Sequence, residues 1–170
     1  ANYWGMSPTC FGPHDQRLIM KRGDVLSYRG PKLGHPLTVI GQPVANLWLA
    51  SDCEDTDLAV KLCVVEPGGR VVSVTNGAFR CRFRDSWSSP KPLQPGVAAL
   101  IRIPMAQTAC RFPAGSRMML QITSSCFPRI LPNPNTMEPT FSTAPHKTAR
   151  NTILFGGATA SALELPVMEP

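Results

Sequence analysis

Apolar and polar residues alternate with a period of two over many short stretches of the chain, which is the pattern of half-buried β-strands. The clearest stretch is 58–66, where Leu58, Val60 and Leu62 share one face. Residues 117–124 alternate in the same way, with Met118, Leu120 and Ile122 on one side. Further strands are predicted at 37–40, 44–50, 71–75, 78–84, 97–105, 108–112, 148–155 and 162–167, and 24–28 has weaker strand character. No stretch of about ten residues keeps a helical period without a breaker.

Glycine and proline separate these strands. Pro67-Gly68-Gly69 predicts one hairpin, Asn76-Gly77 a second turn, and Pro113 to Gly115 the hairpin that leads into 117–124. After Phe127, which we expect to be buried at the sandwich edge, prolines 128, 132 and 134 turn the chain into a long crossing loop. This many short strands, with long crossings between them, predict an all-β fold, a two-sheet jelly-roll sandwich.

Composition and charge argue against several classes of function, namely nucleic-acid binding, membrane binding and zinc binding. The 170 residues suit one domain, and 43% hydrophobic content supports a packed core. The net charge of +6 comes from scattered lysines and arginines, so we expect a solvated basic surface and no nucleic-acid partner. We expect no membrane partner, because no apolar run reaches eighteen residues. The six cysteines lack zinc-ligand spacing and are predicted to be reduced and structural.

A turn with four carboxylates is the first candidate site. Asp52, Asp55 and Asp57 alternate with Cys53, Glu54 and Thr56 over six residues. Closely spaced carboxylates can bind calcium, but the glycine and final glutamate of an EF-hand loop are missing. Aspartate side chains also cap amides in turns. We therefore predict a structural turn, with no metal and no cofactor.

A stripe of arginines is the second candidate site. Arg80, Arg82 and Arg84 would share one face of the predicted strand 78–84, opposite Phe79 and Cys81. Such a stripe can be simply solvated. Alternatively, its guanidinium groups can dock on carboxylates of a partner.

Catalytic machinery is not evident. The chain has no Gly-x-Ser-x-Gly elbow, and its three histidines lie in loop-like stretches beside glycine or proline. Ser124 and Ser125 sit at a strand end without a recognisable base. Trp87, on a polar loop, is a weak candidate for a sugar-stacking platform.

A series of motifs extends over nearly the whole chain. They are Gly41-Gln42-Pro43, Ser51-Asp52, Asp55-Thr56-Asp57, Pro67-Gly68-Gly69-Arg70, Gly77 to Arg84, Leu93-x-Pro95-Gly96, Phe112-x-Ala114-Gly115-x-Arg117, Ser124-Ser125-x-Phe127-Pro128-Arg129, Asn133-x-Asn135-Thr136 and Leu163-x-Leu165-Pro166-Val167. In these motifs and their order the chain resembles the C-terminal domain of X-Pro dipeptidyl-peptidases and of cocaine esterase-like acyl hydrolases. The chain departs from the family pattern at Ser116, Phe155 and Ala160.

The resemblance implies a galactose-binding-domain-like jelly roll at residues 37–170. It also implies a lead-in at residues 1–36 that follows an α/β-hydrolase catalytic domain. The catalytic triad would belong to that domain, on the same or a separate chain, and this domain would pack on it to shape active-site access or a homo-oligomer. The abrupt start without Met suits a piece of a longer protein. The alternative is a free-standing carbohydrate- or ligand-binding module.

Overall fold

The computed structural model describes residues 14–141 and 145–168, and these fold into strands with only short 3₁₀ turns. The strands are β1 (Leu26–Lys32), β2 (Leu37–Gly41), β3 (Val44–Ser51), β4 (Asp57–Val65), β5 (Val71–Arg80), β6 (Ala99–Pro104), β7 (Thr108–Phe112), β8 (Arg117–Thr123), β9 (Asn151–Leu154) and β10 (Ala162–Glu164). The 3₁₀ turns are η1 (Ile19–Lys21), η2 (Cys81–Phe83) and η3 (Gly157–Thr159). The all-β prediction is confirmed.

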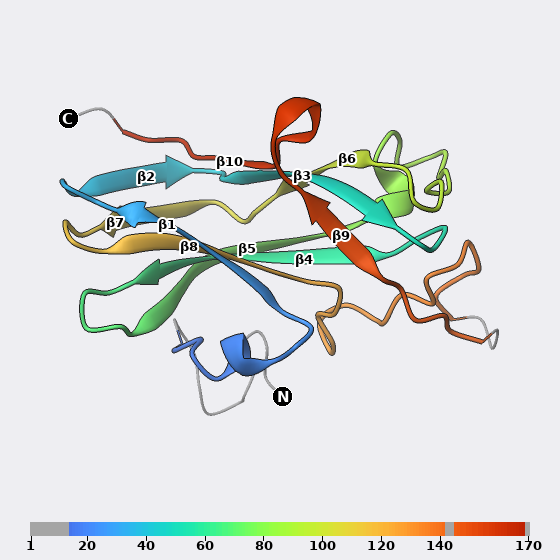
Figure 1. Ribbon diagram of the computed structural model, residues 1–170, viewed down its shortest axis with the longest axis horizontal. Helices are drawn as coiled ribbons and strands as arrows, with labels where there is room; N and C mark the ends of the chain where they lie inside the picture. The colour runs from blue at the N-terminus through green and yellow to red at the C-terminus, as the bar shows by residue number, and fades with distance from the viewer. Residues whose placement is uncertain (1–13, 142–144, 169–170) are drawn as a thin grey trace.

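The strands form a sandwich of antiparallel sheets (Figure 1). The first sheet has the order β1-β8-β4-β5, and the second has the order β10-β3-β6. Strand β9 pairs with the end of β3 that β10 leaves unpaired. Strands β2 and β7 pair with each other as a separate ribbon. The predicted jelly-roll sandwich is therefore confirmed.

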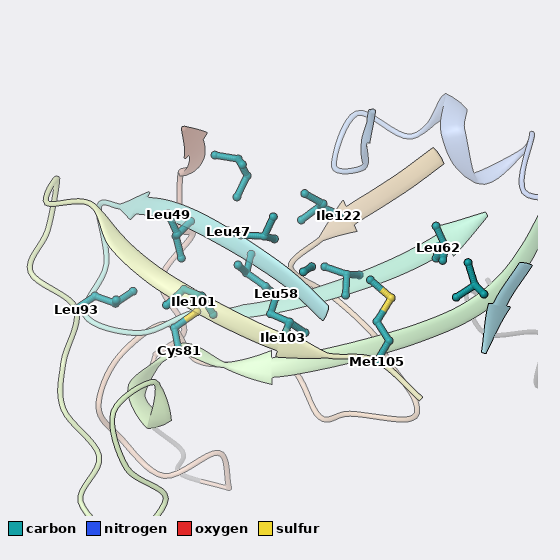
Figure 2. Packing of buried hydrophobic residues seen from close by; sticks show 14 of the residues in the cluster. Leu47, Leu49, Leu58, Leu62, Cys81, Leu93, Ile101, Ile103, Met105 and Ile122 are labelled. Carbon is teal, nitrogen blue, oxygen red and sulfur yellow. The ribbon is translucent and has the colours of Figure 1, made fainter. Parts of the chain in front are cut away.

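The core lies between the two sheets. Figure 2 shows Leu47 and Leu49 of β3 directed toward Leu58 of β4, with Ile101 and Ile103 of β6 completing the layer. All are essentially inaccessible to solvent. The predicted inward face of 58–66 is confirmed, because Leu58, Val60 and Leu62 all lie in this cluster.

Two turn predictions need correction. Asn76-Gly77 is no turn, since β5 runs through it and Gly77 lies opposite Val60 of β4. The glycine is needed because β6 approaches so closely that an added Cβ would lie 2.5 Å from the carbonyl oxygen of Pro104. The turn at Gly115 exists, with a φ of 81°. It connects two different sheets and makes no hairpin, because β7 pairs with β2 while β8 pairs with β1 and β4.

The outer face of the first sheet is also buried, which the half-buried strand pattern did not predict. Residues 14–25 cross this face, below β4 and β5 in Figure 1. The crossing starts at the β5 edge, where the Gln16 amide donates to the Val71 carbonyl at 2.7 Å, and it ends where β1 begins. Met20 of this segment packs against a buried cluster formed by Cys63, Val65, Val71 and Met119. The predicted lead-in thus supplies a cover and, through Leu26–Lys32, a strand of the sandwich, and its boundary at residue 36 stays a prediction.

Lys61 lies under this cover with 2% of its surface exposed, and its Nζ donates to the Gln16 side chain at 2.7 Å. Burial lowers the pKa of Lys61 from 10.5 to about 8. Between about pH 8 and pH 10.5, Lys61 is protonated in the unfolded chain and mostly deprotonated in the folded chain. The contribution of Lys61 to stability therefore rises with pH over this range. From pH 7 to pH 9 we expect the parent to gain about 1 kcal/mol of unfolding free energy relative to Lys61→Met. Urea denaturation of both proteins at each pH measures this gain, and parallel pH profiles would contradict it.

Five described cysteines carry free thiols, namely Cys53, Cys63, Cys81, Cys110 and Cys126. Burial raises the pKa of Cys63 to about 12 and that of Cys126 to about 11. Such thiols stay protonated at neutral pH and behave as small apolar side chains. In the described ranges, no helix is both long and apolar enough to cross a membrane.

Candidate functional site

The acidic turn and the arginines, predicted as separate sites, come together in one network. Asp55 is fully buried and accepts hydrogen bonds from the backbone amide of Arg82 at 2.8 Å and from its Nε at 2.6 Å. Asp57 accepts two bonds from the guanidinium of Arg80, each 2.9 Å long. This two-point pairing raises the pKa of Arg80. Each arginine is therefore neutralised by a carboxylate of the same chain.

Asn133 joins the two ion pairs. Its Nδ2 donates to Asp55 at 2.8 Å and to Asp57 at 2.7 Å, and the side chain is buried. Asn133 was not singled out as a site residue by the sequence. The motif Asn133-x-Asn135-Thr136 is the one sequence signal that could have identified it.

The predicted outward stripe of arginines is wrong. Strand β5 ends at Arg80, and η2 then turns the chain so that Cys81 and Arg82 are both buried. The Arg82 guanidinium donates to backbone carbonyls of residues 136, 137 and 138, and Arg84 donates to the Lys91 and Pro92 carbonyls. Docking of Arg80, Arg82 and Arg84 on a partner stays a prediction, but most of their donors already bind groups of this chain.

The aspartates of the acidic turn lie in different surroundings. Asp52 is exposed and accepts the Arg150 backbone amide at 2.7 Å, which lowers the pKa of Asp52. Asp55 and Asp57 face inward, toward the arginines. In the part of the chain that the structure describes, no cluster of three or more His, Cys, Asp or Glu side chains is placed to hold a metal ion. The stabilising role of the turn stays a prediction.

An apolar groove lies beside the network, with a volume of about 410 Å³. Phe79, Phe83 and Trp87 line it, together with Leu131 and Phe141 of the crossing loop. Trp87 stacks on Phe83 with ring centroids 5.5 Å apart and meets Phe79 edge-on at 5.2 Å. We call this cavity the aromatic groove.

The segment that follows β8 contains two residues considered in the sequence analysis, Ser124 and Phe127. Phe127 is 57% exposed, so its predicted burial is wrong. The chain leaves β8 at Thr123, and the Phe127 side chain extends toward solvent. The Ser124 hydroxyl accepts a hydrogen bond from the Asn151 amide at 2.8 Å. This bond helps to join the end of β8 to β9.

Comparisons with known proteins agree with this architecture. Residues 3–164 match the family described as the X-Pro dipeptidyl-peptidase C-terminal non-catalytic domain. Cocaine esterase of Rhodococcus sp. (strain MB1 Bresler) is 38% identical over 125 residues, which are 74% of this chain and 22% of the esterase. A putative serine esterase of Mycobacterium bovis is 29% identical over 118 residues, 59% of this chain and 19% of that protein.

Solved structures show the same fold. An aminopeptidase from a marine sediment archaeon, Thaumarchaeota archaeon, superposes with a TM-score of 0.85 at 33% identity over 91% of this chain and 27% of its own. An α-amino acid ester hydrolase gives a TM-score of 0.86 at 32% identity with the same coverage. The chain thus spans between 19% and 27% of the length of these relatives. It belongs to the family of non-catalytic C-terminal domains of X-Pro dipeptidyl-peptidases, which also occur in cocaine esterase-like hydrolases.

Proposed function

We propose that this domain packs on the α/β-hydrolase catalytic domain of a serine peptidase or esterase and shapes access to its active site. The observation that carries the proposal is the family match over residues 3–164, because that family is defined as the non-catalytic part of a larger hydrolase. The similar proteins are described as esterases, an ester hydrolase and an aminopeptidase, and the chain spans only 22% of cocaine esterase.

The side chains of the domain support a non-catalytic role. Hydrolysis by a serine enzyme needs a nucleophile within hydrogen-bond reach of a base. The Ser124 hydroxyl is hydrogen-bonded to Asn151, an amide that cannot act as a base, and Asp55 and Asp57 are bound to arginines. The buried polar groups of this site serve to position chain segments.

Two assays test the proposal. The purified chain should not cleave X-Pro dipeptide anilides or aryl esters above background, because the catalytic groups lie elsewhere. The second assay uses the hydrolase domain that is encoded in the same reading frame as this chain or in a neighbouring one. When that domain is coexpressed with the tagged chain, the chain should retain it on an affinity column. The first expectation would be contradicted if the purified chain hydrolysed these substrates, if Ser125→Ala abolished that activity, and if Ser124→Ala preserved it. Recovery of the chain without any hydrolase would contradict the second.

A further inference from the structure

We infer that the aromatic groove is the surface that docks on the hydrolase domain and that this docking is apolar. The inference rests on the proposed function and specifies where, and by what forces, the two domains meet. Apolar docking at the groove differs from the hypothesis that Arg80, Arg82 and Arg84 dock on a partner, because docking by arginines would depend on ionic attraction.

Exposure of large apolar side chains at the groove is the first observation. Trp87 is 73% exposed, Phe141 85% and Leu131 42%, although all three line one cavity. Single exposed apolar residues are ordinary on protein surfaces, whereas a contiguous patch around a concavity marks an interaction site. Tryptophan is enriched among the residues that dominate the binding energy of interfaces.

Rigidity is the second observation. The groove is lined by two distant parts of the sequence, within 79–87 and 130–141, and the buried network connects them. Arg80 pairs with Asp57 of β4 and donates to the Thr140 hydroxyl of the crossing loop. Arg82 pairs with Asp55 and binds the carbonyls at 136, 137 and 138. A surface that is already ordered loses little conformational entropy on binding.

Charge at the groove is the third observation. Arg80 and Asp57, the two charged residues among its lining, neutralise each other. The groove therefore carries no net charge and suits an apolar patch on the partner. Binding through such a surface depends little on salt, whereas docking by free arginines would weaken as salt screens them.

The relatives favour a hydrolase domain as the partner that covers the aromatic groove. The chain spans 22% of cocaine esterase and 27% of the two solved hydrolases, so most of each relative lies outside the matched region. A hydrolase domain of that size can cover the whole groove. A second copy of this chain or a saccharide stacked on Trp87 are the competing occupants.

The experiment coexpresses tagged chain variants with the hydrolase domain and measures how much hydrolase each variant retains. Trp87→Ser/Phe141→Ser should reduce the affinity by at least about 30-fold, the effect of losing a hot spot. Phe141→Ser alone, which leaves the contacts of Trp87 with Phe79 and Phe83 in place, should weaken retention while preserving the thermal midpoint. Phe155→Ser is the matched control, since Phe155 is 56% exposed and packs on Tyr28 away from the groove. It should bind like the parent, and parent retention should be equal at low and high salt.

The outcomes separate the two proposals. If the parent retains no hydrolase, the proposed function itself is wrong. If the parent retains hydrolase and the double variant does so equally well, only the groove assignment is wrong. The assignment would also be overturned if sedimentation showed a dimer of the chain that the double variant abolishes. Saccharide binding by the isolated chain that is lost in Trp87→Ser would overturn it in favour of a carbohydrate site.

Discussion

Asp55→Ala is expected to lower the free energy of unfolding by about 3–5 kcal/mol, because it removes one partner of a buried ion pair. Asp55 is fully buried, and the side chain of Arg82 is only 9% exposed. The substitution leaves the Arg82 guanidinium inside the protein without its carboxylate. It also removes the acceptor of the Arg82 amide and one acceptor of Asn133. Equilibrium denaturation in urea, fitted with a common m-value, measures the loss.

Asp52→Ala is the matched control for this change. Asp52 belongs to the same acidic turn but is exposed, and its side chain accepts a hydrogen bond from the Arg150 backbone amide. Its denaturation midpoint should stay close to that of the parent. Equal midpoints for Asp55→Ala and Asp52→Ala would show that the turn is a solvated loop and that the buried pair contributes no stability.

Gly77→Val is expected to destabilise the sandwich by about 3 kcal/mol, the upper end of the range for overpacking. A Cβ at this position would lie 2.5 Å from the Pro104 carbonyl oxygen and 3.0 Å from the Met105 Cα. Both atoms belong to the backbone, so no side-chain rotation can relieve the clash. The β5 and β6 segments must separate, and the hydrogen bond from the Ala106 amide to the Asn76 carbonyl at 2.8 Å would be strained.

Gly30→Val provides the comparison, since Gly30 is also a strand glycine. A Cβ there would meet only the Met118 carbonyl oxygen at 3.6 Å, an ordinary contact. Thermal denaturation should show a clearly lower melting temperature for the variant at 77 than for the variant at 30. Similar melting temperatures would mean that β6 is not held against β5 at Gly77.

The alternation of apolar and polar residues predicted correctly which face of a strand lies in the core. The alternation of Leu58, Val60 and Leu62 placed one face of β4 in the core because a strand directs successive side chains to opposite sides. It could not show that the opposite face, with Lys61 and Cys63, is also covered. That cover comes from residues 14–25, about forty positions earlier in the chain, and no periodic signal links the two segments.

The candidate site was harder to predict, because it depends on contacts between distant segments. The alternation from Phe79 to Arg84 is typical of a strand, yet the chain enters a 3₁₀ turn after Arg80. This turn brings Arg82 to Asp55, 27 positions away, and Asn133 reaches the same carboxylate from 78 positions away. A local pattern of charges cannot distinguish a solvated arginine from one paired inside the fold. The aspartates and arginines were recognised separately, and only the fold shows that they neutralise each other.

The aromatic groove, held by buried ion pairs, is the surface where we infer that this non-catalytic domain meets its hydrolase domain. Hydrogen exchange measured by mass spectrometry, on the chain alone and in complex with the hydrolase domain, tests it most directly. We expect slower exchange in the complex for peptides covering residues 79–88 and 130–141, with little change at residues 153–165. Protection at 153–165, with unchanged exchange at 79–88 and 130–141, would contradict it.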